Sequence, residues 1–320
     1  MSNNIRVLLV GAGYMGKEYA KVLSALNIDF DVVTRSKKTA ETFANEIGIK
    51  PYVGGLEQFE KIKGKYSHSI NAVSVNELSN VTIKILSLGI KNILVEKPVG
   101  IDYESVKKVF ECAKRADANV FVGYNRRYYS STQKAQEIIN DDGGLLSVNF
   151  EFTEWKSKID FSKYPKDVEE KWLIANSTHV IDLAFYFAGE PEKYCFYSGH
   201  NLEPSKDIFV GSGITTKGVY FNYSTNWDSP GRWGVELLTN KHRLYLRPME
   251  KLFVQNTNSI EILESSINDI LDLEYKPGLY NETKDFINIV PSCRLKSIDE
   301  QLVSINTYYE ILNGKENFEN

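Results

Sequence analysis

Apolar and polar positions follow two alternating rhythms in the first 124 residues. The apolar run Val7–Val10 is typical of a strand buried on both faces of a parallel sheet. Apolar residues spaced three and four apart follow it from Tyr19 to Leu26 and predict a helix. Further helices alternate with four more predicted strands, at 30–34, 70–75, 92–95 and 119–123. This alternation predicts a doubly wound parallel sheet of the Rossmann type over residues 1–124.

Polar residues mark where these helices begin. Ser36 or Thr39 opens the helix that closes near Gly48, Ser79 caps the next one, and Asp102 caps the last. Each has a side-chain oxygen that can accept a hydrogen bond from a free backbone N–H of the first helical turn.

The pattern changes after residue 124. A helix is predicted at 131–140, an alternating strand at 147–155, and a helix that contains His179 and ends at Gly189. Short strands separated by turn residues are expected at 193–198, 208–215, 218–224, 235–239 and 243–246, and helices at 280–289 and 298–312. We therefore expect a second α/β domain over 125–320, with a large, mostly antiparallel open sheet.

The composition narrows the class of protein. The 320 residues are 42% hydrophobic and 25% charged, and 38 Lys and Arg against 42 Asp and Glu give a net charge of −4. No basic block stands out, so neither a nucleic acid nor an anionic membrane is expected as a partner. No run approaches the ~20 apolar residues that span a bilayer.

Cysteine and histidine usage gives no sign of a metal site. Cys112, Cys195 and Cys293 are far apart, and the four histidines are dispersed. Scattered cysteines are typical of reduced thiols in a cytoplasmic protein, and we expect no metal.

A glycine-rich turn joins the first strand to the first helix. Gly11-Ala12-Gly13-Tyr14-Met15-Gly16 matches G-x-G-x-x-G. The first glycine permits the bend, the second lets the backbone approach a pyrophosphate, and the third lets helix and strand pack closely. The position of the motif favours dinucleotide binding over a purely structural turn.

The end of the second strand selects between the two nicotinamide dinucleotides. Thr34-Arg35-Ser36-Lys37-Lys38 stands where NAD enzymes usually place an acid for the ribose hydroxyls. A guanidinium and a hydroxyl suit a 2′-phosphate, so we expect NADP to be preferred over NAD, with Arg35 and Ser36 holding the phosphate. The alternative is a solvated, charged turn.

Glu96-Lys97-Pro98 follows the predicted strand 92–95 directly. It therefore lies at the carboxyl edge of the sheet, where ligands bind in open α/β folds. Proline favours an extended Lys97 and allows a cis Lys97–Pro98 bond. Lys97 could then hydrogen-bond a substrate hydroxyl and the nicotinamide ribose, although a lone lysine is usually a surface charge.

Together these motifs resemble the Gfo/Idh/MocA family, the glucose–fructose oxidoreductase and inositol dehydrogenase group. The motifs that carry the resemblance are G-A-G-Y-M-G at 11–16, A-V-S-V-N at 72–76, E-K-P at 96–98, G-Y-N-R-R-Y at 123–128 and S-T-H-V-I-D-L-A at 177–184. The resemblance implies hydride transfer between a nicotinamide and a carbinol or carbonyl carbon, usually of a sugar or cyclitol. It also implies a C-terminal sheet that forms a homodimer or homotetramer.

The resemblance also implies roles for single residues. Lys97 would orient the substrate and His179 would exchange a proton with the reacting oxygen, unless His179 is only structural. Asp182 would orient His179 or contact substrate. Further cofactor contacts would come from Ser74, Asn76 and Glu96. Asn125 and Arg126 would contact the cofactor or the substrate. The alternative is that they take part in ion pairs between the domains.

One departure from the family pattern lies just before His179. Many members carry an aspartate and a glycine at the positions of Ala175 and Ser177. His179 would then act without that aspartate, or Asn176 or Asp182 would supply a weaker partner.

Aromatic and basic residues flank the predicted substrate region. Trp172 is a candidate sugar platform or a core residue, and Trp155 lies nearby in sequence. Arg232, in Pro230-Gly231-Arg232-Trp233, could approach an anionic substrate such as a nucleotide-linked sugar.

The expected function is an NAD(P)-dependent sugar oxidoreductase. Two other classes stay open: a non-catalytic NADP-binding regulator of the same fold, and a glycosidase that uses bound NAD for transient oxidation.

Overall fold

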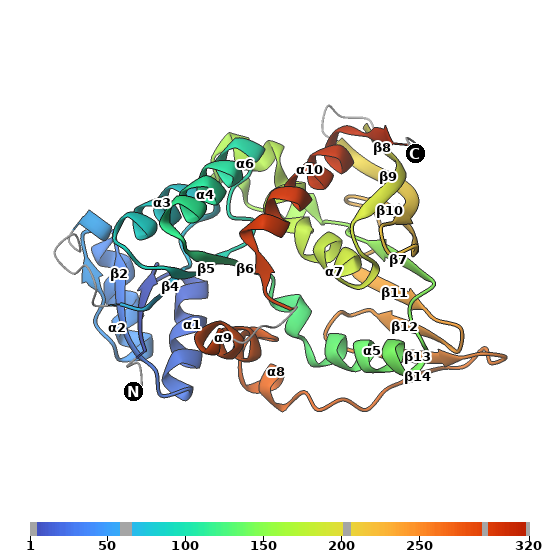
Figure 1. Ribbon diagram of the computed structural model, residues 1–320, viewed down its shortest axis with the longest axis horizontal. Helices are drawn as coiled ribbons and strands as arrows, with labels where there is room; N and C mark the ends of the chain where they lie inside the picture. Colours follow the sequence, from blue (N-terminus) through green and yellow to red (C-terminus); the bar gives the residue numbers. More distant parts are fainter. Residues whose placement is uncertain (1–4, 58–65, 201–205, 290–293, 318–320) are drawn as a thin grey trace. The chain divides into compact units, whose positions relative to one another are not determined.

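The computed structural model describes residues 5–57, 66–200, 206–289 and 294–317 (Figure 1). Packing divides the chain into two compact units. The first consists of Met1–Asn125 and Leu271–Val303, and the second of Arg126–Ile270 and Ser304–Asn320. Cys293, one of the three cysteines, lies outside the described residues.

A seven-stranded sheet forms the centre of the first unit, in the order β15-β6-β5-β4-β1-β2-β3. Its strands are β1 (Arg6–Val10), β2 (Asp29–Thr34), β3 (Tyr52–Val53), β4 (His68–Asn71), β5 (Asn92–Glu96), β6 (Asn119–Gly123) and β15 (Lys296–Ser297). All pair in parallel except β15, which is antiparallel to β6. The first six strands have the 3-2-1-4-5-6 order of a dinucleotide-binding sheet.

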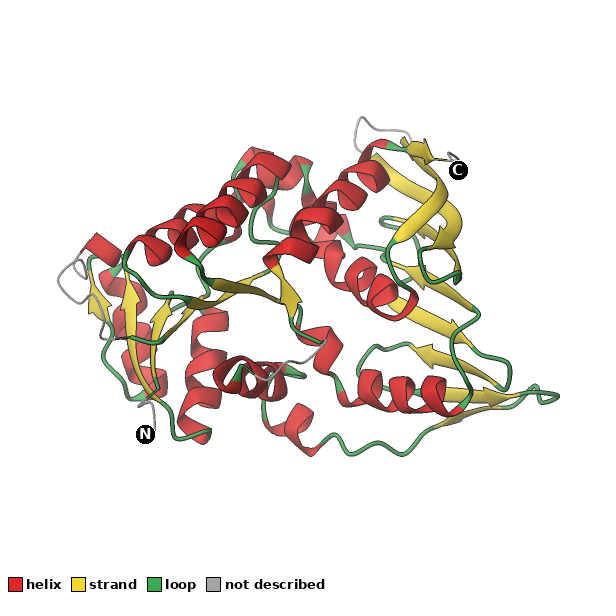
Figure 2. Cartoon of the chain, viewed as in Figure 1, coloured by secondary structure: helices red, strands yellow, loops and turns green. Residues whose placement is uncertain are grey.

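Helices cover both faces of this sheet (Figure 2). They are α1 (Tyr14–Ala25), α2 (Lys37–Ile47), α3 (Leu78–Ser87), α4 (Tyr103–Ala116) and α9 (Leu279–Asn288). The pair α3 and α4 lies on one face, and α1, α2 and α9 lie on the other. With both faces covered, β1 buries Val7 to Val10 almost completely, as the apolar run predicts.

Two of the predicted helix caps are confirmed. The Ser36 hydroxyl accepts a hydrogen bond from Thr39 N–H at 3.3 Å, and Asp102 Oδ1 accepts one from Ser105 N–H at 2.7 Å. The cap at Ser79 is wrong, because α3 already begins at Leu78 after a 3₁₀ turn at Val75–Glu77.

Residues 271–303 return to the first unit, although the sequence pattern placed them in a second domain of 125–320. Lys296 pairs with Val122 at the edge of the parallel sheet. Phe286 of α9 packs edge-on against His68 and Phe121, with ring centroids 5.3 and 6.4 Å apart. A two-residue strand and a single helix carry no sequence signal of where they dock. The functional division at residue 124 stays a prediction.

The second unit contains a nine-stranded sheet in the order β14-β13-β12-β11-β7-β10-β9-β8-β16. Its strands are β7 (Ser147–Glu151), β8 (Pro191–His200), β9 (Lys206–Thr215), β10 (Tyr220–Asn226), β11 (Gly234–Leu238), β12 (His242–Leu246), β13 (Phe253–Asn256), β14 (Ile262–Glu264) and β16 (Lys315–Asn317). Among the described strand pairs of this sheet, β7 and β10 alone are parallel. The predicted fold class is thereby confirmed: a Rossmann sheet and a large, mostly antiparallel second sheet.

Helices α5 (Ser130–Asp141) and α7 (Thr178–Ala188) pack on one face of this sheet (Figure 2). The second unit also contains the short helix α6 (Lys166–Glu170), and two more helices have residues in both units, α8 (Ile270–Glu274) and α10 (Ile298–Asn313). Along β10, Phe221 and Tyr223 are buried under the helices, whereas Tyr220 is 65% exposed. The opposite face of the sheet is therefore open to solvent.

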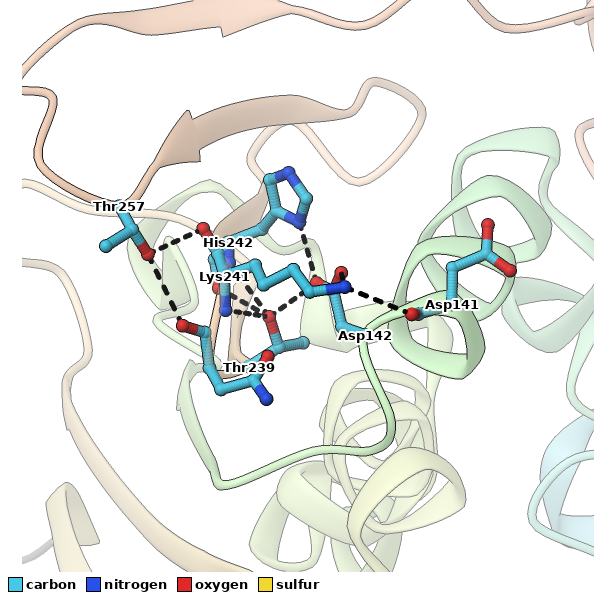
Figure 3. A network of polar contacts seen from close by, with 7 residues as sticks. Asp141, Asp142, Thr239, Lys241, His242 and Thr257 are labelled. Carbon is cyan, nitrogen blue, oxygen red and sulfur yellow. Dashed lines mark hydrogen bonds and ion pairs between the residues drawn. The ribbon is translucent and has the colours of Figure 1, made fainter.

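A polar network fastens the end of α5 to the β11–β12 hairpin (Figure 3). The Asp142 carboxylate accepts hydrogen bonds from the Thr239 hydroxyl and from His242 Nδ1, each at 2.6 Å. Lys241 Nζ lies 3.6 Å from the same carboxylate. Burial by itself raises the pKa of Asp142, but these hydrogen bonds and cations hold that pKa below its usual value.

Candidate active site

A cavity of about 280 Å³ opens in the first unit at the carboxyl ends of β1, β2 and β4. Gly11, Ala12 and Gly13 of the glycine turn line it, together with Thr34 and Arg35 at the end of β2. This is the edge of an open parallel sheet at which ligands bind.

The three glycines fit a dinucleotide turn, each for a different reason. A Cβ on Gly11, whose φ is +111°, would lie 2.5 Å from the Ala72 carbonyl oxygen, and a Cβ on Gly16 would overlap the Gly11 carbonyl oxygen. Both contacts exclude a side chain. A Cβ on Gly13 would meet nothing within 4 Å, so this glycine borders open space. That space is where a pyrophosphate would approach the backbone.

Gly13 is also the N-cap of α1, and no side chain caps this twelve-residue helix. The first backbone N–H groups of α1 are therefore available to an anion. Tyr14 and Met15 begin the helix; Tyr14 is 65% exposed, and Lys276 Nζ lies 5.1 Å from the centre of its ring. The residues present thus fit the pyrophosphate of a dinucleotide.

Two ion pairs sit on the ribose side of the cavity. Arg35 Nη1 lies 3.5 Å from Glu77 Oε2, and Lys84 Nζ lies 2.8 Å from Glu57 Oε1. The hydrogen bond from Lys84 lowers the pKa of Glu57. Ser36 lines the same side, with its hydroxyl oxygen engaged as the cap of α2. Neither Glu77 nor Glu57 is predicted by the sequence pattern, because each lies more than 20 residues from Arg35 along the chain.

Ser74 and Asn76 follow β4 at the same edge. Ser74 is exposed and lines the cavity. Asn76 is exposed and donates a hydrogen bond to Glu77 Oε1 at 3.4 Å, but it is not part of the cavity wall.

The segment Glu96–Pro98 lies at the end of β5, and the Lys97–Pro98 bond is cis, one of the two forms the sequence allowed. Tyr19 donates a hydrogen bond to Glu96 Oε1 at 2.9 Å, and its hydroxyl lies 3.4 Å from Glu282 Oε2. Burial and the two carboxylates raise the pKa of Tyr19 well above its usual value. Glu96 is therefore anchored by a neutral tyrosine, and half-buried Lys97 follows it directly.

In the second unit, His179 lies in the first turn of α7 and is only 7% exposed. Its ring centroid is 6.1 Å from that of Trp233. Just before α7, Asn176 and Ser177 donate hydrogen bonds to Glu154 Oε1 at 2.8 and 2.7 Å. Glu154 is a third acid that the sequence did not predict. Its signal would have been a carboxylate three residues after the end of β7, an alternating strand.

Asp182, three residues after His179, is held by Arg127. Arg127 Nε and Nη2 donate to the two carboxylate oxygens at 2.7 and 2.8 Å, and both side chains are buried. The arginine carbon Cζ also lies 4.9 Å from the centre of the Tyr186 ring. A two-point pair of this kind fixes the Asp182 side chain in one orientation.

The remaining predicted residues are divided between packing and exposed positions. Trp172 is buried edge-on against Phe161 and Tyr164, with ring centroids 5.1 Å apart in each pair, as expected of a core residue. Asn125 donates a hydrogen bond to the Pro277 carbonyl oxygen at 2.9 Å within the first unit. Its neighbour Arg126 belongs to the second unit and places Cζ 5.2 Å from the centre of the Trp233 ring.

Arg232 packs between two indole rings. Its Cζ lies 5.0 Å from the ring centre of Trp155 and 4.9 Å from that of Trp233. Its Nη1 donates to Glu154 Oε2 at 3.2 Å. The structure thus brings Arg126, Arg232 and His179 around the indole of Trp233.

The described residues contain neither a metal-binding cluster nor a membrane-spanning helix. Within residues 5–57, 66–200, 206–289 and 294–317, no group of three or more His, Cys, Asp or Glu residues has the arrangement of a metal site. The helices described over the same ranges include none that is both long and apolar enough to cross a bilayer.

The region that contains the glycine turn is similar to a known protein family. Residues 5–124 match the model of the Gfo/Idh/MocA oxidoreductase family, described as an NAD-binding Rossmann fold. An uncharacterized oxidoreductase of Streptococcus pneumoniae serotype 4 is 24% identical over 241 residues, which cover 71% of this chain and 63% of the relative. Oxidoreductase P35 of Formosa agariphila is 21% identical over 211 residues, which cover 62% of this chain and 64% of the relative. Both matches span less than two thirds of the relative.

Solved structures share the fold over nearly the whole chain. A levoglucosan dehydrogenase in complex with NADH has a TM-score of 0.80 at 15% identity, covering 98% of each chain. UDP-N-acetylglucosamine 3-dehydrogenase from Acidithiobacillus ferrooxidans has a TM-score of 0.74 at 13% identity, covering 96% of each chain. An oxidoreductase from Agrobacterium radiobacter, in complex with NAD⁺, L-tartaric acid and magnesium, has a TM-score of 0.79 at 14% identity, covering 98% of each chain.

Proposed function

We propose that the chain, whose residues 5–124 match the Gfo/Idh/MocA oxidoreductase family, is an NAD(P)-dependent enzyme of that family acting on a sugar or sugar derivative. It would transfer a hydride between the nicotinamide and a carbinol or carbonyl carbon. The observation that carries this proposal is the glycine turn on the 280 Å³ cavity, with a side chain excluded at Gly11 and Gly16 and open space at Gly13. The levoglucosan and UDP-N-acetylglucosamine dehydrogenases of the same fold support a sugar substrate.

Two residues would carry the proton side of the reaction. Lys97 would hydrogen-bond the reacting oxygen and polarise it. His179 would take the proton during oxidation and return it during reduction, because an imidazole can act both as a base and as an acid. The bound nicotinamide supplies only the hydride acceptor or donor.

The cofactor would be NADP in preference to NAD. Arg35 lines the ribose side of the cavity with 72% of its side chain exposed, so it can meet a 2′-phosphate. Ser36 would support the phosphate from the next position, and Thr34, Ser74, Asn76 and Glu96 would contribute the other contacts.

A substrate screen tests the function. Purified protein is mixed with free and nucleotide-linked sugars, and NADPH and NADH absorbance are followed separately. We expect at least one sugar to change the absorbance, faster with the phosphorylated cofactor. Tight NADPH binding without turnover of any sugar would instead indicate a non-catalytic role, and sugar cleavage without net redox change would indicate a glycosidase.

The open face of the nine-stranded sheet would form the contact of a homodimer or homotetramer. Tyr220 and Tyr197, 65% and 59% exposed, lie on this sheet. Light scattering of Tyr220→Lys protein tests the contact: we expect the assembly to dissociate, whereas an unchanged mass would exclude this face.

A further inference from the structure

The arginines around Trp233 identify the kind of substrate that the second unit takes. We propose that the sugar carries an anionic group, a carboxylate or a phosphate ester, and that Arg232 binds this group beside His179. The inference rests on the proposed function, since it names the substrate class of that enzyme.

Arg232 is held in place before any ligand arrives. The indoles of Trp155 and Trp233 flank its guanidinium, with Cζ 5.0 and 4.9 Å from the two ring centres. The Trp155 Nε1–H donates to the Gly231 carbonyl oxygen at 3.1 Å, which fixes the indole against the loop that carries the arginine. A planar guanidinium that packs on two aromatic rings loses little conformational freedom when it binds an anion.

One edge of this guanidinium is used by the protein, and the other is open. Nη1 donates to Glu154 Oε2 at 3.2 Å and approaches the Thr153 carbonyl oxygen at 3.5 Å. In the described part of the chain, Nε and Nη2 of Arg232 have no acceptor, and the side chain is 47% exposed. The Nε–Nη2 edge is the fork that binds a carboxylate or phosphate through two parallel hydrogen bonds.

Two arginines lie over the Trp233 ring, and a buried acid anchors one of them. Cζ of Arg126 and Cζ of Arg232 lie 5.2 and 4.9 Å from the ring centre, and Arg232 Nη1 pairs with Glu154 Oε2 at 3.2 Å. Glu154 is 2% exposed. Burial raises its pKa against the opposing hydrogen bonds from Ser177, Asn176 and Arg232. The enclosed Glu154 carboxylate therefore anchors Arg232 through Nη1. It cannot rotate toward solvent and occupy the Nε–Nη2 edge in place of a ligand.

The guanidinium of Arg232 and the ring of His179, the proposed proton-exchanging residue, border the same indole. The Trp233 ring centre is 4.9 Å from Arg232 Cζ and 6.1 Å from the His179 ring centre. One indole therefore borders both groups. A single sugar carrying its charge on one substituent can meet the guanidinium while another of its carbons faces the imidazole.

Three matched probes test the inference: D-glucose, D-glucuronate and D-glucose 6-phosphate. Each is titrated calorimetrically into the NADPH-loaded wild-type protein and into Arg232→Gln protein. Arg243→Gln serves as the control, because Arg243 is also about half exposed (41%), pairs with Glu236, and lies over the Tyr245 ring. We expect at least one charged probe to bind the wild type ~10-fold or more tightly than glucose, and Arg232→Gln to weaken that binding ~10- to 150-fold. Arg243→Gln should bind all three like the wild type.

The outcomes separate this inference from the proposed function. Tighter glucuronate binding identifies a carboxylate, and tighter glucose 6-phosphate binding identifies a phosphate. Glucose binding as tightly as both anions, or anion binding unchanged in Arg232→Gln, would overturn the anion site even if neutral sugars were oxidised. If the wild type oxidised or reduced none of the sugars but still bound an anion in an Arg232-dependent way, the oxidoreductase proposal would be overturned and the anion site would remain.

Discussion

Glu77 holds Arg35 at the mouth of the nucleotide cavity, with its Oε2 3.5 Å from the arginine Nη1. The arginine expected to bind a 2′-phosphate is therefore shared with a carboxylate of the protein. A phosphate placed at Arg35 would be attracted by the guanidinium and repelled by Glu77, and we expect the balance of these two interactions to set the preference between NADP and NAD.

Arg35→Ala should weaken NADPH binding about 10- to 150-fold while changing NADH binding little, since only NADPH carries the 2′-phosphate. Glu77→Gln should act in the opposite direction and tighten NADPH binding several-fold. The Kd values of both cofactors are measured by fluorescence titration. Glu41→Gln is the control, because Glu41 pairs with Lys37 at 4.0 Å outside the cavity wall. If Arg35→Ala left the ratio of the Kd for NADPH to the Kd for NADH unchanged, Arg35 would not be the residue that binds the 2′-phosphate.

Lys97→Ala and His179→Ala should each lower kcat by about 10²- to 10⁴-fold, the usual contribution of a positioned acid or base. Cofactor affinity should survive in both, because neither residue lines the 280 Å³ cavity. Stopped-flow kinetics and NADPH fluorescence give the two readouts. Undiminished turnover in both variants would show that Lys97 and His179 are not the catalytic residues.

The buried Arg127–Asp182 pair should be essential for stability. Asp182→Asn removes the whole negative charge of the carboxylate that faces the buried guanidinium, and should lower the free energy of unfolding by about 3–5 kcal/mol. Arg127→Met with Asp182→Leu removes both charges and should recover most of that loss. Urea denaturation measures each. If the double variant regains stability but not activity, Asp182 also contacts substrate; if it regains neither, the ion pair is not the cause of the loss.

Stability should fall in mild acid because of His68. Its ring is 4% exposed, packs on Phe286, and burial lowers its pKa to about 4. The unfolded chain binds this proton below about pH 6.5 and the folded protein only near pH 4, so stability present at neutral pH is lost between those values. From pH 7 to pH 5 the loss from this one group is about 2 kcal/mol. His68→Gln should show a correspondingly flatter pH dependence, and an NMR titration of the His68 ring with a midpoint near 6.5 would contradict the account.

The sequence predicted those parts of the fold whose signal is local. The apolar run at Val7–Val10, the glycine turn and the Ser36 and Asp102 caps all depend on neighbouring residues, and the structure contains them. The ion pairs between Arg35 and Glu77 and between Glu154 and Arg232 join residues 42 and 78 positions apart. Such pairings leave no periodic pattern in the sequence, because they form only when the folded backbone brings distant residues together. The same holds for the short β15 strand, whose place is decided by the open edge of β6.

The return of β15 and α9 has a consequence for anyone who divides this chain. Residues 1–125 alone would expose the unpaired edge of β6 and remove the Phe286 ring from His68 and the Glu282 carboxylate from Tyr19. A bare strand edge and an uncovered apolar surface favour aggregation. A fragment that keeps the cofactor site intact therefore needs a graft: residues 271–303 must be fused back onto it by a new linker.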